Sequence, residues 1–290
     1  MDVQSCRFDC VPHIGTGRRS LSARAAHVAL IKGIDMRKLA YLLAAPAVVL
    51  AMPAAAQDVY VGVSGGLSLP EDSANRGRFT SNVAATPDYP AIASGTPLAW
   101  TTRFKSGFNI SGQIGARFDN GFRTELEVAY SQYDVRRHRN LSVGGTEIDG
   151  LDVSVLTRGA PAAGNPTVGQ VINDGRGKVK NLGAFANVFY DFNRAEAFQP
   201  YLGAGLGVQR VDVEYRPSGV DVANDDQTRF AYQFMAGATY QVSPRVDLFA
   251  QYTYRRTEGR ANVDLNLLPA RLGVESNLSI VGAGLRFKLN

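Results

Sequence analysis

Residue types that commonly perform catalysis are scarce in this sequence. Beyond residue 56 the chain has one histidine, His138, which stands between Arg137 and Arg139. A Ser-His-acid site would use this imidazole as its general base and would need a nucleophile beside it. No serine forms a recognisable pattern with His138, so we interpret it as a solvated loop residue. The sequence predicts no catalytic residues and a protein that is not an enzyme.

Two glycine motifs have the look of phosphate-binding loops. The stretch 203–207 (GAGLG) lies within a regular alternation of residues, which places it inside a strand with no helix after it. The stretch 175–178 (GRGK) is followed by Val179, whereas a phosphate loop has Ser or Thr there. Neither an HxxE motif nor a cysteine pair offers metal ligands beyond residue 56. We expect no cofactor and no metal.

An alternation of apolar and polar residues with period two organises the chain. In the stretch 230–242 (FAYQFMAGATYQV), aromatic residues, alanines and valine share one parity. After the break 243–245 (SPR), the alternation resumes over 246–255. Period two is typical of strands with one apolar face, and a short break with proline suits a hairpin. Strands of ten or more residues with aromatics at both ends of the apolar face are long enough to cross a bilayer.

The same alternation recurs eight times, and the connections alternate between long and short. The long connections are polar segments at about 70–106, 135–178, 216–227 and 259–275. Antiparallel strands that cross a membrane give this pattern, with short periplasmic turns and long outer loops. Lipid cannot satisfy a free sheet edge, so the sheet must close. The sequence predicts an all-β chain that forms a closed eight-stranded antiparallel up-and-down transmembrane β-barrel.

Glycines on the polar parity indicate which face lies inside. Gly203, Gly205 and Gly207 alternate with apolar residues, as do Gly282 and Gly284. Bare glycine is a weak choice for a water-exposed strand, but it leaves room for bulky neighbours inside a narrow barrel. We therefore place the apolar parity against lipid. A secreted soluble barrel that buries its apolar face is the alternative.

Charged residues share the parity that we place inside. An eight-stranded barrel is just wide enough for side chains to fill it. Isolated charges in such a space are costly, so opposite charges must pair. We predict a closed polar plug without a large pore, and a narrow channel is the alternative. The predicted lumen charge network is Arg117, Arg123, Glu125, Glu127, Asp247, Arg255 and Arg286.

Basic residues also gather where the predicted strands meet the long connections. They form charge-assisted hydrogen bonds with phosphate, so a basic collar at the outer interface would suit lipopolysaccharide. Such residues can equally be soluble anchors beside the apolar band, and the sequence leaves both interpretations open. The predicted lipopolysaccharide-contact rim is Arg136, Arg137, Arg139, Lys178, Lys180 and Arg256.

The beginning of the chain has the features of an export signal. From Met36 a positive region is followed by an apolar run and small residues, so we expect a signal peptide over 36–56 with cleavage before Gln57. Residues 1–35 then form an upstream or misassigned start, and 57–290 the barrel domain. Both cysteines and seven of the 31 basic residues precede residue 57, against three of the 26 acidic ones. The remaining 24 basic and 23 acidic residues nearly balance, so charge gives no support to nucleic-acid binding and we expect no nucleic-acid partner.

Three stretches carry a family resemblance. They are 199–208 (QPYLGAGLGV), 230–256 and 281–289 (VGAGLRFKL), and with them 57–290 resembles the OmpA-like, opacity-type outer-membrane β-barrels of proteobacteria. The resemblance implies a place in the cell outer membrane, contact with outer-membrane lipids and lipopolysaccharide, and insertion by the outer-membrane assembly machinery. It also implies a role in envelope integrity and, through four extracellular loops, an adhesin-like contact with a host or surface ligand. A small-solute porin-like channel is the alternative, and a lipid-modifying enzyme is a weaker one.

Overall fold

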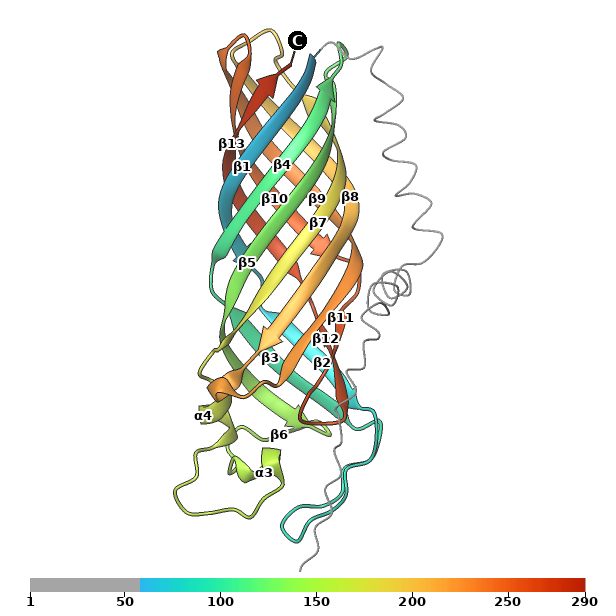
Figure 1. Cartoon of the computed structure of the whole chain (residues 1–290), viewed down its shortest axis with the longest axis vertical. Coiled ribbons are helices and arrows are strands. Elements are labelled where there is room, and N and C mark those ends of the chain that lie inside the picture. Colours follow the sequence, from blue (N-terminus) through green and yellow to red (C-terminus); the bar gives the residue numbers. More distant parts are fainter. Residues whose placement is uncertain (1–57, 290) are drawn as a thin grey trace, which may run out of the picture. The chain divides into compact units, whose positions relative to one another are not determined.

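The computed structural model of the chain describes residues 58–289, and these residues fold almost entirely into antiparallel strands (Figure 1). The expected leader, with Met36 and the cleavage before Gln57, lies outside the described residues. Between 58 and 289 no helix is long and apolar enough to cross a membrane. The strands are β1 (Asp58–Pro70), β2 (Ser73–Phe79), β3 (Pro97–Phe104), β4 (Gly107–Arg117), β5 (Phe122–Val143), β6 (Thr146–Glu147), β7 (Gly177–Asp191), β8 (Phe198–Tyr215), β9 (Ala223–Ser243), β10 (Val246–Thr257), β11 (Ala261–Asp264), β12 (Ala270–Val274) and β13 (Asn277–Lys288). The helical elements are α3 (Ser154–Thr157), α4 (Val168–Ile172) and the 3₁₀ turn η1 (Pro217–Gly219).

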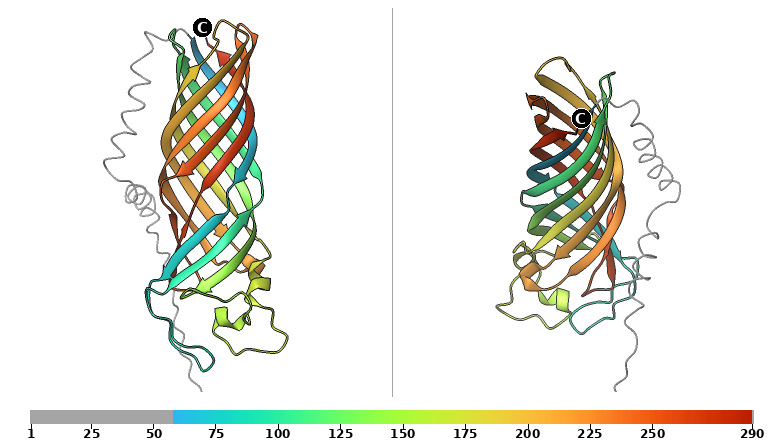
Figure 2. Two further views of the ribbon diagram at one scale, coloured as in Figure 1. Left: turned by 180° about the vertical axis from the view of Figure 1, so that it is seen from behind. Right: turned by 45° about the horizontal axis from the view of Figure 1, so that its top comes forward.

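Eight of the strands close into a ring. The order is β1, β4, β5, β7, β8, β9, β10 and β13, and β13 returns to pair with β1. The closing register runs from Tyr60 opposite Lys288 to Pro70 opposite Leu278. The view into the barrel in Figure 2 shows this ring. The prediction of a closed, eight-stranded, antiparallel barrel is confirmed.

The two ends of the barrel differ in their connections. Short turns join β4 to β5, β7 to β8 and β9 to β10 at the end where β1 begins and β13 ends (Figure 1). The first of these turns has Gly121 at φ 88°, a backbone conformation that glycine adopts freely. Long connections with α3 and α4 lie at the opposite end. We call the two parts of the barrel the turn-side half and the loop-side half.

The polar segments that form the long connections contain further strands. β2 and β3 form within the segment 70–106, and β11 and β12 form within 259–275. β5 continues to Val143. These strands pair in the order β11-β12-β2-β3-β5, so the barrel wall continues past the apolar band. They are hard to detect in the sequence because each is only four to eight residues long.

Along a single strand, the outward residues change from apolar to polar and the inward residues change from polar to apolar. On β8 the outward Leu206 is 52% exposed in the turn-side half, and the outward residues of the loop-side half are Arg210, Asp212 and Glu214. On the inward parity, glycines and the buried Gln209 give way to Val211 and Val213. The turn-side half is 58–69, 107–132, 181–209, 230–256 and 281–289, and the loop-side half is 70–106, 133–180, 210–229 and 257–280.

The loop-side half is filled by a hydrophobic core, which the sequence did not indicate. Its residues come from strands on all sides of the barrel and from α4. Its buried members are Phe79, Leu98, Trp100, Tyr133, Val135, Leu141, Ile148, Val168, Ile172, Val179, Val211, Val213, Tyr215, Ala223, Ala261, Val263, Ala270, Leu272, Val274, Leu278 and Ile280. The turn-side half instead exposes large apolar side chains on its outside, and the exposed set includes Val63, Phe108, Ile110, Val128, Leu182, Leu202, Phe234, Leu248 and Val281.

Candidate functional site

The interior of the turn-side half holds a layer of paired charges close to the short turns. Arg123 on β5 is 0% exposed, and its guanidinium donates from Nε and Nη2 to the carboxylate of Asp191 at 3.0–3.2 Å. Its Nη1 donates to Glu125 Oε2 at 3.2 Å and to the Tyr60 hydroxyl at 3.1 Å. That hydroxyl in turn donates to Glu125 Oε2 at 2.7 Å. A buried guanidinium with two carboxylates has the partners that burial of a charge requires.

The same layer continues towards β10 and β13. Arg117 Nη1 lies 3.0 Å from Asp247 Oδ2, and Lys288 Nζ lies 3.8 Å from the other oxygen of that carboxylate. Arg286 donates from Nη1 to Thr239 Oγ1 at 3.0 Å, and its Nε lies 3.9 Å from Glu125 Oε2. Arg117, Asp247 and Arg286 are each less than 5% exposed.

A second polar layer lies closer to the loop-side half. Arg255 Nη2 donates to Glu127 Oε1 at 3.1 Å, and Arg255 Nε donates to Gln233 Oε1 at 2.8 Å. The other oxygen of Glu127 accepts from Gln233 Nε2 at 2.8 Å and from Asn187 Nδ2 at 3.0 Å. Each oxygen of the buried carboxylate therefore has a donor, and the ion pair is held in a fixed position.

Aromatic rings cover the buried guanidiniums. The Arg286 guanidinium carbon lies 3.8 Å from the centroid of the Phe249 ring, and that of Arg123 lies 4.0 Å from the Phe189 ring. Arg255 stacks in the same way on Phe185, at 4.2 Å. A desolvated cation over a ring face gains about 2 kcal/mol, which offsets part of the cost of burial.

The structure places all seven residues of the predicted lumen network inside the barrel, in these two layers. Sequence reasoning missed Tyr60, Asp191, Asn187 and Gln233 as partners, although inward parity would have included them. The stretch 203–207 gives the charges room. A Cβ added at Gly205 would lie 1.9 Å from Asn187 Oδ1, so a larger residue there would displace the amide that bonds Glu127 and Gln233.

The predicted basic rim is not one site. Lys178 and Lys180 are neighbours on β7, but Arg256 is on β10, separated from them by β8 and β9. Lys178 Nζ lies 3.6 Å from Glu214 Oε2, and Lys180 stands opposite Asp212. The three remaining arginines, Arg136, Arg137 and Arg139, lie farther out on β5, and none of the ion pairs within residues 58–289 involves them.

The interpretation of His138 as a solvated residue is wrong. β5 extends into the loop-side half, where its pairing with β3 contains register shifts. The His138 side chain on this part of β5 is only 4% exposed. His138 Nδ1 lies 2.8 Å from the Thr102 hydroxyl, and its ring contacts Trp100 and Tyr215 edge to face. Burial lowers the pKa of the imidazole from 6.5 to about 4, because Asp174 offsets the loss of solvation only in part. The imidazole is a neutral member of the core.

Hydrogen bonds tie the four loops at the end of the loop-side half into a closed circuit. We call the loops 80–96, 148–176, 216–222 and 265–269 loop 1 to loop 4. Between loops 1 and 2, Arg158 Nη2 donates to the carbonyls of Ala84, Tyr89 and Pro90 at 2.9, 3.3 and 2.7 Å. Between loops 2 and 3, Ser218 donates from its backbone N to Asp174 Oδ2 at 2.5 Å.

The remaining two contacts complete the circuit. Between loops 3 and 4, Asn266 N donates to Val222 O at 2.9 Å, and between loops 4 and 1, Thr80 N donates to Pro269 O at 2.7 Å. Arg158 and Ser218, which brace loop 2 on its two sides, have φ of 61° and 53°. Non-glycine residues adopt this left-handed conformation at a cost, so the surrounding contacts must hold them in it. The loops therefore present one pre-organised surface.

The charge pattern and the reversal along β8 are those of a chain that meets lipid over the turn-side half and water over the loop-side half. Comparisons with known proteins agree. The family model of the outer membrane protein beta-barrel domain matches residues 42–287. Among curated proteins, an uncharacterised protein of Brucella abortus is 26% identical over 164 residues, which cover 53% of this chain and 53% of that protein. The match thus spans about half the length of that relative.

Solved structures give a similar picture at low similarity. Neisserial surface protein A is 18% identical with a TM-score of 0.39, over 80% of this chain and 97% of that one. The outer membrane protein OprG from Pseudomonas aeruginosa is 14% identical with a TM-score of 0.43, over 80% and 97%. These scores add nothing to the assignment, which rests on the family match. Because that match covers most of the sequence, the chain belongs to the outer membrane protein β-barrel domain family, and its place is the cell outer membrane.

Proposed function

We propose that the protein is a non-conducting outer-membrane barrel that holds a rigid loop surface outside the cell. In this role it supports envelope integrity and makes adhesin-like contacts with a host or surface ligand. The observation that carries the proposal is the filling of the barrel along its length. Paired charges occupy the turn-side half, and a hydrophobic core occupies the loop-side half.

The proposed orientation follows from connection length and solvent preference. Outer-membrane barrels have short periplasmic turns and longer extracellular loops. The short turns of this chain are at the end where β1 begins, so this end faces the periplasm. The loop-side half then extends beyond the outer leaflet, where water favours an apolar inside and a polar outside. Loops 1 to 4 are the proposed extracellular loops.

The two fillings resist ions in different ways. A hydrated ion that enters the turn-side half would have to displace guanidinium–carboxylate pairs whose members are less than 10% exposed. An ion that passed them would next meet the hydrophobic core, where an unpaired charge is very costly. Both barriers favour a closed barrel over the porin-like alternative.

Single-channel recording in planar bilayers tests this proposal. We expect the purified, folded barrel to give no discrete conductance steps in 1 M KCl, while a general porin inserted under the same conditions gives steps. Discrete steps that scale with the amount of folded barrel would instead establish the porin-like function.

The adhesin-like role rests on the loop circuit. Surfaces that are ordered before binding lose less conformational entropy when a partner docks, which favours affinity. Bacteria that carry the wild-type protein should attach to host cells or coated matrix more than bacteria without it. A variant in which loops 1 and 2 are shortened should fold but lose that difference. Equal attachment by all three strains would contradict the role.

Lipopolysaccharide is the proposed lipid partner, and Arg136, Arg137 and Arg139 carry this proposal because acidic residues do not neutralise them in the described part of the chain. Replacing all three with Ser should reduce the lipopolysaccharide that copurifies. Arg210 is the matched control, since Asp226 already pairs with it at 2.9 Å. Equal retention by the triple variant and by Arg210→Ser would show that the three arginines serve only as soluble anchors.

We further propose that the protein is not an enzyme and that the outer-membrane assembly machinery inserts it. The buried, neutral His138 supports the first point, because a general base must reach a substrate. On an SDS gel, the folded barrel should migrate faster before boiling than after it. Depletion of the assembly machinery should abolish this faster, folded form. Lipid hydrolysis by the purified barrel, lost in His138→Phe, would contradict the absence of catalysis.

A further inference from the structure

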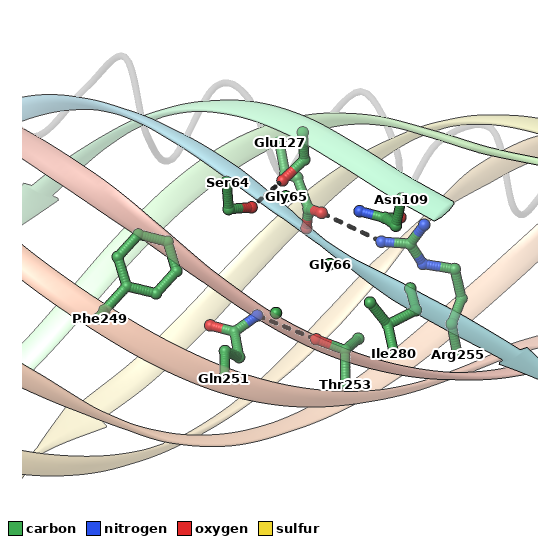
Figure 3. A pocket seen from close by; sticks show the side chains of 12 residues that line it. Ser64, Gly65, Gly66, Asn109, Glu127, Phe249, Gln251, Thr253, Arg255 and Ile280 are labelled. Atoms are coloured by element: carbon green, nitrogen blue, oxygen red, sulfur yellow. Dashed lines mark hydrogen bonds and ion pairs between the residues drawn. The ribbon is translucent and has the colours of Figure 1, made fainter. Parts of the chain in front are cut away.

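A small cavity lies beside the Glu127–Arg255 pair, on the side of β1, β4 and β13 (Figure 3). It offers about 20 Å³ to the centres of water molecules. One water needs at least about 10–15 Å³ by this measure, so there is room for one or two. The lining consists mainly of hydroxyl, amide and charged groups together with glycine backbone, and Phe249 and Ile280 add two apolar side chains.

Glycines explain why no side chain fills this space. A Cβ added at Gly66 would lie 2.3 Å from the carbonyl oxygen of Val281, and one added at Gly282 would lie 2.9 Å from that of Gly65. Both contacts are with backbone, which cannot move aside as a flexible side chain does. The closeness of β1 and β13 therefore keeps both positions bare, and the missing side chains leave the cavity.

The two sides of Glu127 differ in how their polar groups are satisfied. On the side of Asn187 and Gln233 the hydrogen bonds are complete, and both oxygens of the carboxylate accept from protein donors. On the cavity side Asn109 is 5% exposed, and its Oδ1 has no hydrogen-bond partner in the described part of the chain. A buried acceptor left in this way costs about 1–3 kcal/mol, so a native barrel is expected to satisfy it.

The chemistry of the lining selects the occupant. Ser64 Oγ and Ser111 Oγ lie 2.7 Å apart, and either can donate to or accept from a third group. Water does both, and it can donate to Asn109 Oδ1. A cation would lie next to the charge of Arg255, and an apolar ligand would leave Asn109 unpaired, so both are disfavoured.

We propose that this cavity is a hydration site, in which one or two ordered waters bond Asn109 Oδ1 and the Ser64–Ser111 pair. The polar interior of the turn-side half is then dry on the side of β7 and β9 and hydrated on the side of β1, β4 and β13. The inference adds a water site to the proposed filled lumen and rests on that filling.

Water-edited NMR of the wild-type barrel in lipid or detergent tests the proposal. Magnetisation should pass from water to the side-chain amide of Asn109 within milliseconds. Asn181 is the matched control, because its Oδ1 accepts from Gln209 and Ser276 and its Nδ2 donates to Ser131. Transfer to Asn109 and not to Asn181 supports the hydration site. No transfer to Asn109 overturns it, and equal transfer to both residues would show an open lumen and so contradict the filled barrel itself.

An Asn109→Leu variant gives a second readout of the same site. If water satisfies Asn109, removing the amide also removes the bonds of the water, and the midpoint temperature of the boiling-induced gel shift should fall by several degrees. If the cavity is dry, the substitution removes an unpaired polar group and fills space, and the midpoint should rise. A rise would overturn the proposal. Should the variant fail to assemble, the wild-type NMR measurement decides alone.

Discussion

The two halves of this barrel share a wall and exchange what lies inside and outside it. In the turn-side half Arg123 is fully buried and Leu206 is 52% exposed, whereas in the loop-side half Val213 is fully buried and Arg210 faces outward. The strands are continuous across the boundary on β5, β7, β8 and β9. One backbone architecture therefore serves both arrangements, and the surrounding solvent decides which parity is apolar.

This difference shows what holds each half together. In water, burial of apolar surface stabilises the loop-side half by about 25 cal/mol per Å². In lipid, contact between apolar side chains and the surroundings is already favourable, so the turn-side half depends on a closed ladder of backbone hydrogen bonds and on satisfied internal polar groups. Substitutions that are mild in one half should therefore be severe in the other.

The largest effect is expected at the centre of the charge layer. Arg123→Met removes the guanidinium that bonds both Asp191 and Glu125, and the nearest cations that remain lie 3.8 and 3.9 Å from these buried carboxylates, so the loss is about 3–5 kcal/mol. Urea unfolding in detergent micelles should show this loss, or the heat-modifiable folded form should be absent. Arg210→Met is the control in the loop-side half. Its pair with Asp226 is exposed and contributes at most about 1 kcal/mol, so equal losses in the two variants would contradict the contrast between the halves.

Two outward leucines, one in each half, allow the same substitution to be compared in lipid and in water. Leu206 is 52% exposed in the turn-side half and Leu267 is 60% exposed on loop 4. Leu206→Arg should destabilise the barrel by about 2–4 kcal/mol, because it places a charge against lipid. Leu267→Arg should change stability by less than about 0.5 kcal/mol, because water surrounds it. Unfolding midpoints of the two variants that differ by less than the experimental error would mean that both positions meet the same solvent.

The loop-side core should weaken in acid through His138. Its pKa is about 4 in the folded chain and about 6.5 when unfolded, so only the unfolded state takes up the proton between these values. Stability is complete above pH 6.5 and falls by about 3 kcal/mol as the pH drops to 4. Fluorescence of Trp100, the sole tryptophan and a ring contact of His138, should report the change. In His138→Phe this decline should be absent, and an unchanged pH profile in that variant would assign it to other groups.

The smallest effect is expected at the loop circuit. Arg158→Ala removes the donor to three carbonyls of loop 1, and because these bonds lie near water the local loss is on the order of 1 kcal/mol. Limited proteolysis should cleave loop 1 several-fold faster, with global unfolding unchanged. Arg158→Lys keeps the charge but has a single ammonium group, so it should restore the protection only in part. Full protection in the alanine variant would show that loop 1 is held by its other contacts.

The turn-side half could be predicted from the sequence because lipid imposes long, regular strands. Ten or more residues of strict alternation define each strand, and the inward parity identifies the charges from Arg117 to Arg286. Which charges pair could not be predicted. The contact between Arg123 and Asp191 depends on register across the β5–β7 pair, and register does not follow from the parity of either strand.

The loop-side half could not be predicted because water permits shorter and less regular elements. β11 and β12 have four and five residues, too few for a period to be distinguished from chance. His138 stands in a run of arginines that is typical of a solvated loop, and only its position on the extended β5 makes it a core residue. The braces of loop 2 likewise depend on contacts between distant segments, such as Arg158 with Ala84.

A cysteine scan along β8 tests the exchange of inside and outside most directly, since residues 58–289 contain no cysteine. Single substitutions Leu206→Cys, Arg210→Cys and Val213→Cys would be treated on intact cells with a water-soluble, membrane-impermeant thiol reagent. We predict rapid labelling at position 210 and none at 206, which faces lipid, or at 213, which faces the core. Labelling at 206 or 213 comparable to that at 210 would contradict a wall that passes from lipid to water while its interior passes from charged to apolar.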